Sequence, residues 1–386
     1  MKGLAALRGS TLLRHLLLAL VGLVVVLGVT QVVPDFTNYN LATVGAYICA
    51  AAGLTLLTGT SGQVSLGQAA FMMIGGYSVA LLQSAFINGG ADGLWLLPLN
   101  LVLATLIAAA AGGVIGVAAA RLHGPYLAGA TLALGVALPP LTSRYSHVFK
   151  GDQGLPVTFD GPPSGLGSFS LQHWQAWISL FAALIVLVLL ANLGRSAVGR
   201  HMRAVRDDEI AAQLAGLSVA RVRVLAFSVS AAAAGLGGGL FVVALQTASP
   251  GSFDLTLSLG LLSAVVIGGL GSLSGAVIGS VLVVYLSIWL RDFTDGLGLS
   301  AASAQRLHDN LPPAVYGLLL ILFMLLLPGG IQSLLRKAAA LVVRRPTSAS
   351  AVPAATQENP ASGDKEWAPV PDHGASSSPP SSPQPR

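Results

Sequence analysis

The stretch LWLLPLNLVLATLIAAAAGGVIGVAAA, residues 94–120, contains no charged side chain and decides the fold. It belongs to a longer apolar block, because Asp35 and Asp92 are the only charged residues between Arg14 and Arg121. Over all 386 residues only 9% are Asp, Glu, Lys or Arg, whereas soluble domains carry about 25% because their surface faces water. The composition excludes an ordinary soluble protein and predicts an all-α, polytopic membrane helix bundle.

Apolar runs on both sides of this stretch are also long enough to cross a membrane. A helix needs about 20 residues to cross roughly 30 Å of hydrocarbon. The block at 255–290 is too long for one crossing, and its glycine-rich centre, GGLGSLSG at 268–275, predicts a break into two segments. We expect about ten spans, including broken or re-entrant segments, at 14–33, 41–58, 68–87, 94–120, 125–143, 174–193, 224–247, the two parts of 255–290, and 312–328.

The positions of Lys and Arg predict the orientation of these spans, since cytoplasmic loops carry an excess of both. With ten spans and a cytoplasmic N-terminus, the cytoplasmic side holds Lys2, Arg8, Arg14, Arg121, the arginines from Arg195 to Arg223, Arg336, Lys337, Arg344 and Arg345. The outer side holds only Arg144, Lys150, Arg291 and Arg306. We therefore expect both termini in the cytoplasm. The basic residues lie beside apolar runs, so membrane topology explains them without nucleic acid.

Composition divides the chain at about residue 345. Residues 1–345 hold every long apolar run and form the expected transmembrane domain. Residues 346–386 contain nine Pro and eight Ser. Such a segment buries too little apolar surface to offset its ordering entropy, so it predicts a disordered Pro/Ser-rich cytoplasmic tail.

The chain lacks the patterns that catalysis or nucleotide binding requires. No G-x-x-x-x-G-K loop is present to hold phosphates, and no two of the seven histidines have H-x-x-x-H spacing. The single cysteine, Cys49, excludes a multi-cysteine metal site. We expect no catalytic residue, no metal site and no cofactor.

Two small-residue features have a structural and a functional interpretation. The segment TGTSGQVSLGQ at 58–68 is either a plain turn at the membrane surface or irregular backbone buried in protein or lining a wet cavity. Glycines spaced four apart favour tight helix packing, although a dimer seam or a pathway lining stays possible. They occur at Gly112/Gly116, Gly235/Gly239, Gly271/Gly275 and Gly275/Gly279.

A charged loop at 194–222 separates two apolar runs. Its centre predicts one short helix from Arg203 to Leu217, in which Ile210, Leu214 and Leu217 share a face. Arg203 and Asp207 are spaced to form an ion pair, and Gly216 is placed to end the helix. A basic amphipathic helix on anionic lipid is one interpretation. Three consecutive acids, at 207–209, favour a protein partner instead.

At this loop the sequence resembles a known family. The segment GRHMRAVRDDEIAA at 199–212, continuing to Gly216, is similar to the LivM-type permease subunits of branched-chain amino-acid ABC importers. The resemblance extends to GTSGQVSLGQAAFMMIGGY at 59–77, GPYL at 124–127, VIGGLGSLSG at 266–275 and residues 316–329. Together these blocks cover most of residues 40–335.

The resemblance implies a non-enzymatic permease of the bacterial inner membrane, with ATP hydrolysis on a separate subunit. The implied partners are ATP-binding subunits, a LivH-like second permease subunit and an external substrate-binding protein. The charged loop resembles the helix that couples a permease to its ATP-binding subunit, with one residue inserted after Glu209. The implied coupling residues are Arg203, Arg206, Asp207, Asp208, Glu209, Ile210, Ala212, Leu214 and Gly216. The candidates for the substrate pathway are Gln63, Ser65 and Gln68.

Other functions stay open at this point. Related importers handle urea, short amides or sugars. A self-sufficient secondary carrier is favoured by the glycine-rich breaks, but the long charged loop and the scarcity of ionisable residues within the spans disfavour it. An intramembrane enzyme is the remaining class, and the sequence offers no catalytic constellation for it.

Overall fold

The computed structural model describes residues 11–335, apart from residues 91, 92, 94, 123, 159–161, 163–168, 299 and 328. These residues belong to Met1–Val342, one of two units into which the chain divides. The expected tail at 346–386 and the basic residues at 2, 8, 336, 337, 344 and 345 lie outside the described residues.

Long helices make up most of the described chain, which confirms the predicted all-α bundle. They are α2 Thr11–Val32, α3 Asp35–Thr55, α4 Gln68–Asn88, α5 Leu96–Ala119, α6 Pro125–Arg144, α8 Leu171–Arg195, α11 Val219–Leu245, α12 Leu255–Gly268, α13 Leu273–Asp295 and α14 Ala301–Leu326. Shorter helices are η1 Leu56–Thr60 (a π-helix), α7 Ser146–Phe149, η2 Gly151–Gln153, α9 Ala197–Asp207, α10 Glu209–Leu214 and η4 Pro250–Phe253. Strands β1 Leu155–Pro156 and β2 Thr247–Ala248 pair antiparallel, with Leu155 opposite Ala248.

Nine helices within the described residues are long and apolar enough to cross a membrane, and α2 contributes a shorter apolar stretch, Ala19–Val32. Each expected span corresponds to one of these helices. Several helices extend beyond the apolar run that predicted them, and α14 begins at Ala301 instead of near 312. Its first turns are polar, and the side chain of Asn310 donates to the carbonyl of Arg306 at 2.7 Å. An apolar run therefore marks the part of a helix expected to lie in the hydrocarbon layer and not the ends of the helix.

The predicted break near residue 270 is present. Gly269 and Gly271 have φ angles of +113° and +80°, a region that side chains with a Cβ rarely adopt. The chain reverses there, and α12 packs along α13 with Gly268 against Gly275 and Gly279 against the carbonyl of Ala264. With 14 residues, α12 is about 21 Å long, shorter than the hydrocarbon layer.

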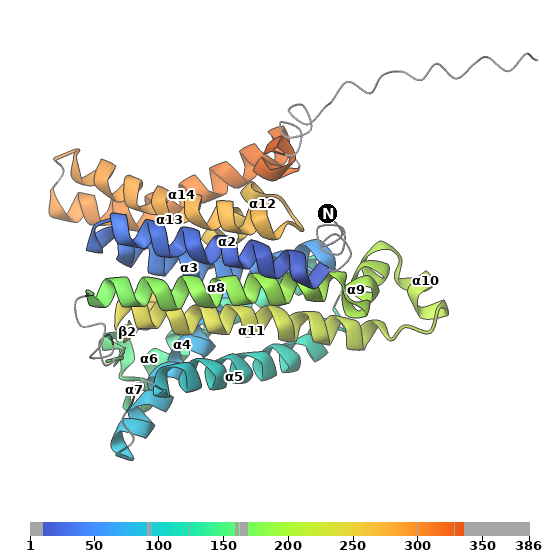
Figure 1. Ribbon diagram of the computed structural model, residues 1–386, viewed down its shortest axis with the longest axis horizontal. Coiled ribbons are helices and arrows are strands. Elements are labelled where there is room, and N and C mark those ends of the chain that lie inside the picture. The colour runs from blue at the N-terminus through green and yellow to red at the C-terminus, as the bar shows by residue number, and fades with distance from the viewer. Residues whose placement is uncertain are drawn as a thin grey trace, which may run out of the picture. The chain divides into compact units, whose positions relative to one another are not determined.

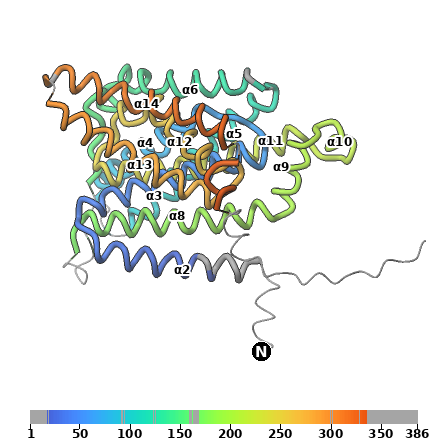
Figure 2. Tube along the Cα trace, turned by 90° about the horizontal axis from the view of Figure 1, so that it is seen from above, coloured from blue at the N-terminus to red at the C-terminus, as the bar shows by residue number. Residues whose placement is uncertain are grey.

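Helix α11 forms the centre of the bundle and packs against α3, α4 and α5 (Figure 1). Figure 2 shows α2 beside α8 at one edge and α6 at the opposite edge. A Cβ at Gly116 of α5 would approach the Cα of Val224 to 2.9 Å, and Gly235 of α11 lies against both Ala108 and Gly75. At these positions the glycine spacing serves tight packing between helices of this chain.

Candidate functional site

The charged loop folds into two helices at one end of the bundle, not into the single helix expected from Arg203 to Leu217 (Figure 1). Helix α9 ends at Asp207, and Asp208 is extended, with φ −155° and ψ 111°. The carboxylate of Asp208 accepts hydrogen bonds from the backbone N–H groups of Ile210 at 2.9 Å and Ala211 at 3.0 Å. Aspartate caps a helix better than it sits inside one, so a new helix, α10, begins after it.

The expected ion pair between Arg203 and Asp207 is wrong. The guanidinium of Arg203 instead donates to the carbonyl of Gly194 at 2.7 Å, near the end of α8, where backbone carbonyls lack helical partners. Asp207 pairs with its neighbour Arg206, with 2.8 Å between Nη2 and Oδ1. Gly216, at φ +84°, follows the end of α10 as predicted.

The predicted apolar face of the loop divides into two. Ile210 and Leu214 are 73% and 85% exposed and lie one helical turn apart on α10. Leu217 instead packs against a small cluster of Val205, Ala212 and Val219, which holds α10 to α9 and α11. The loop thus presents two large apolar side chains outward, and Ala212 serves its internal packing.

Glu209 forms an ion pair with Arg223 of α11. The side chain of Arg223 is 9% exposed and that of Glu209 is 38% exposed. Arg223 also donates to the carbonyl of Ala120, directly after α5, at 3.4 Å. This pair ties α10 to two helices of the bundle. Sequence reasoning missed the role of Arg223, although an arginine that lies one turn inside a mostly apolar helix was the available signal.

Arg206 connects the loop to the other polar feature found in the sequence. Its Nη1 donates to the carbonyl of Gly59 at 2.5 Å. A Cβ at Gly62, which has φ +72°, would come within 2.5 Å of the Arg206 side chain. Gly59 in turn lies against Gly271 in the turn between α12 and α13. Three segments that are distant in sequence therefore meet at this end of the bundle.

Residues 56–68, which we call the buried polar segment, consist of η1 and the irregular chain up to the start of α4. Gln63, Ser65 and Gln68 are buried, so the segment is not a plain exposed turn. The backbone N–H of Leu66 donates to Thr131 Oγ1 of α6 at 3.0 Å, and that of Ala69, the next residue after the segment, to Ser258 Oγ of α12 at 3.1 Å.

The expected pathway residues occupy this segment. The amide of Gln68 donates to the carbonyl of Ala50 at 3.0 Å, and that of Gln63 donates to Ser61. The Oε1 atoms of Gln63 and Gln68 are buried without a hydrogen-bond partner, an arrangement that costs free energy unless a ligand or water supplies a donor. A cavity of about 770 Å³ between α5 and α8 is lined by other residues.

Residues 36–327 match the protein family described as "Branched-chain amino acid transport system / permease component". The chain is 33% identical to the high-affinity branched-chain amino acid transport system permease protein LivM of Escherichia coli K12, over 64% of this chain and 62% of that protein. It is 30% identical to LivH of the same organism, over 76% of this chain and 93% of the relative. It is 26% identical to BraD of Pseudomonas aeruginosa, over 77% and 97%.

The match to LivM covers 62% of that relative's length. No solved structure matches the chain. Within the described residues, no group of three His, Cys, Asp or Glu side chains is placed to hold a metal ion.

Proposed function

The chain belongs to the permease-component family of branched-chain amino-acid transport systems, and we propose that it is the membrane subunit of an ATP-driven importer for these amino acids. A separate ATP-binding subunit hydrolyses ATP and docks on α9 and α10. A second, LivH-like permease subunit completes the translocation path, and an external binding protein delivers the substrate. In this arrangement the subunit spans the bacterial inner membrane with both termini in the cytoplasm.

The contact of Arg206 with Gly59 carries the proposal. Arg206 belongs to α9, whereas Gly59 belongs to the buried polar segment that leads to Gln63, Ser65 and Gln68. A partner that moves α9 therefore acts directly on the segment that we assign to the substrate path. Bistable helix packing converts such local movement into alternating access.

Ile210 and Leu214 support docking of a protein partner. Two large, mostly exposed apolar side chains on a short helix suit insertion into a groove, because apolar anchors supply most of the binding energy of a small interface. Around them, Arg203, Arg206, Asp207 and Asp208 provide polar contacts at the rim. Glu209, Ala212 and Gly216 set the position and the end of α10.

The test replaces Ile210 and Leu214 together by serine in the complex reconstituted with its ATP-binding subunits. We expect loss of co-purification and of ATP-dependent leucine uptake in proteoliposomes. The matched control is Leu297→Ser, at a leucine that is 48% exposed after the end of α13. Unchanged association and uptake in the double variant contradict the docking role.

The same vesicles separate this proposal from a self-sufficient carrier. The permease without ATP-binding subunits is expected to accumulate no solute against a gradient, whatever ion gradient is imposed. Accumulation by the subunit alone overturns the proposed function. Urea, short amides and sugars as competitors of leucine uptake distinguish the branched-chain amino-acid assignment from its alternatives.

A further inference from the structure

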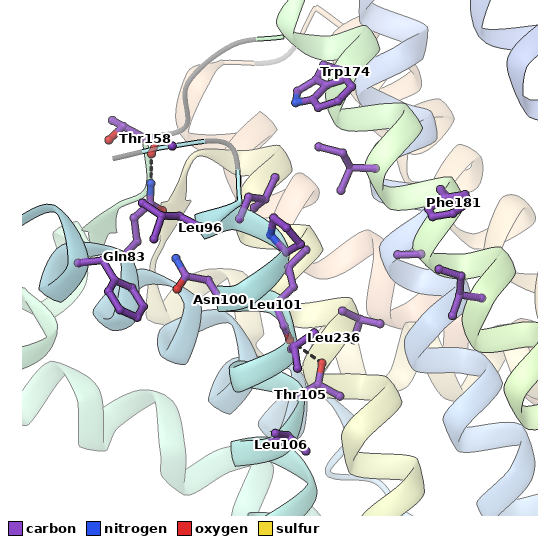
Figure 3. Close-up of a pocket in the computed structure, with 18 of the residues that line it drawn as sticks. Gln83, Leu96, Asn100, Leu101, Thr105, Leu106, Thr158, Trp174, Phe181 and Leu236 are labelled. Atoms are coloured by element: carbon purple, nitrogen blue, oxygen red, sulfur yellow. Dashed lines mark hydrogen bonds between the residues drawn. The ribbon is translucent and has the colours of Figure 1, made fainter. Parts of the chain in front are cut away.

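The cavity between α5 and α8, whose lining Figure 3 shows, is bounded by no residue of the buried polar segment. Its floor includes Leu236 of α11. Val102 and Leu106 of α5 and Phe181 of α8 line it although each is more than half exposed. In a bilayer, side chains in this position face hydrocarbon, so the cavity is open to the lipid.

Two amide side chains, Gln83 and Asn100, line this mostly apolar space. They are 9% and 1% exposed, respectively. The amide nitrogen of Gln83 donates to the carbonyl of Thr158, which leaves its Oε1 buried without a partner. Asn100 Oδ1 is also buried without a partner. Both oxygens lack a donor, and a buried acceptor left in that state destabilises the fold.

Helix geometry places both amides near the same end of the bundle. Gln83 precedes the end of α4 by five residues and Asn100 follows the start of α5 by four, distances of about 7.5 and 6 Å along the helix axes. This end carries Trp174, near the start of α8, and lies opposite α10 (Figures 1 and 3). The cavity continues to Ile185, about 21 Å along α8 from its start. In a bilayer the cavity therefore extends from the level of the lipid headgroups into the hydrocarbon core.

The residues that line the cavity decide which polar group of a ligand can bind there. None of the described residues that line the cavity is ionisable, and its two buried polar atoms without a partner are both acceptors. A free carboxylate or an anionic headgroup would therefore face acceptors and no countercharge. A zwitterionic amino acid therefore fits poorly. A primary ammonium group has three N–H donors and is attracted to amide oxygens, whereas a quaternary choline group has no N–H donor.

We propose that this cavity binds a membrane lipid with a primary-ammonium headgroup, whose N–H groups donate to Gln83 Oε1 and Asn100 Oδ1 and whose acyl chain lies between α5 and α8. The lipid phosphate stays at the water boundary. The lipid satisfies both orphaned acceptors and covers the exposed apolar walls. This site is independent of the proposed transport function.

The first test measures lipid retention. The full chain is purified from an equal mixture of phosphatidylethanolamine, phosphatidylcholine and phosphatidylglycerol, and bound lipids are counted by native mass spectrometry. We expect about tenfold enrichment of phosphatidylethanolamine over phosphatidylcholine, equivalent to about 1.4 kcal/mol. The Gln83→Leu/Asn100→Leu variant should lose the enrichment. Thr105→Val is the matched control, because the Thr105 hydroxyl lines the same cavity but already donates to the carbonyl of Leu101 at 2.7 Å.

A second measurement decides the matter if the double variant does not fold. Phosphatidylethanolamine with brominated acyl chains should quench tryptophan fluorescence of the unaltered chain more than brominated phosphatidylcholine does. Trp174→Phe should remove that difference, because Trp174 lines the cavity. Equal retention or equal quenching by the two lipids overturns the proposal. Cross-linking in the assembled complex can also overturn the proposal. It does so if a helix of the second permease subunit, and no lipid, lies between Val102 and Phe181.

Discussion

The ion pair between Glu209 and Arg223 predicts an asymmetry between its two single substitutions. Glu209→Ala leaves a guanidinium in a position where the arginine side chain is 9% exposed. Breaking a fully buried pair costs about 3–5 kcal/mol and an exposed pair about 0–1 kcal/mol. Because Glu209 is 38% exposed, we expect an intermediate loss of about 2 kcal/mol in the free energy of unfolding.

Arg223→Met should cost less, about 1 kcal/mol or below, because the carboxylate of Glu209 can turn toward water and methionine retains most of the apolar packing. The double variant should resemble Arg223→Met alone, since it leaves no uncompensated buried charge. Unfolding in detergent, titrated with SDS, measures all three free energies in one double-mutant cycle. A larger loss for Arg223→Met than for Glu209→Ala, or additive losses in the double variant, refutes this reasoning.

Three further predictions concern glycine contacts and the helix cap. Gly279→Ala should destabilise the chain by about 1–3 kcal/mol in the same SDS titration, because its Cβ overlaps a carbonyl of α12, whereas Gly317→Ala in the open part of α14 should not. Asp208→Ala should cost about 1 kcal/mol of local stability, detected as faster amide hydrogen exchange in α10 while α11 is unchanged. Gly59→Ala should reduce ATP-dependent uptake while the ATP-binding subunits still co-purify, because its Cβ displaces the contact with Gly271; normal uptake would show that this contact is dispensable.

The sequence predicted the bundle because the membrane restricts the available structures. Where water is absent, a long apolar run without strand alternation satisfies its backbone as a helix, so each expected span corresponds to one helix. The break at Gly269 was also predictable, since a reversal through φ angles of +113° and +80° strongly favours glycine. The start of α14 was not, because polar turns continue a helix beyond the apolar run into the interface.

The charged loop shows where sequence reasoning fails. The pattern that joined Ile210, Leu214 and Leu217 on one face treated Asp208 as a helical residue. Its side chain instead caps a new helix, which turns Leu217 inward. The contacts of Arg206 and Arg223 were also missed, because both join residues far apart in the chain and depend on tertiary packing. The amides at Gln63 and Gln68 were identified, but their burial could be established only from the fold.

The contacts around Gly59 restrict how the loop can transmit motion. Gly59 is held between the guanidinium of Arg206 and the backbone of Gly271. Packed interiors deform little, so a displacement of α9 cannot be absorbed locally at a backbone-to-backbone contact. It must either break the hydrogen bond from Arg206 or move the buried polar segment together with the α12–α13 turn. The second course shifts Gln63 relative to the bundle without unfolding a helix, because residues 61–67 are already irregular. We therefore propose that this glycine contact, besides its role in packing, is the point through which movement of α9 would reach the buried amides.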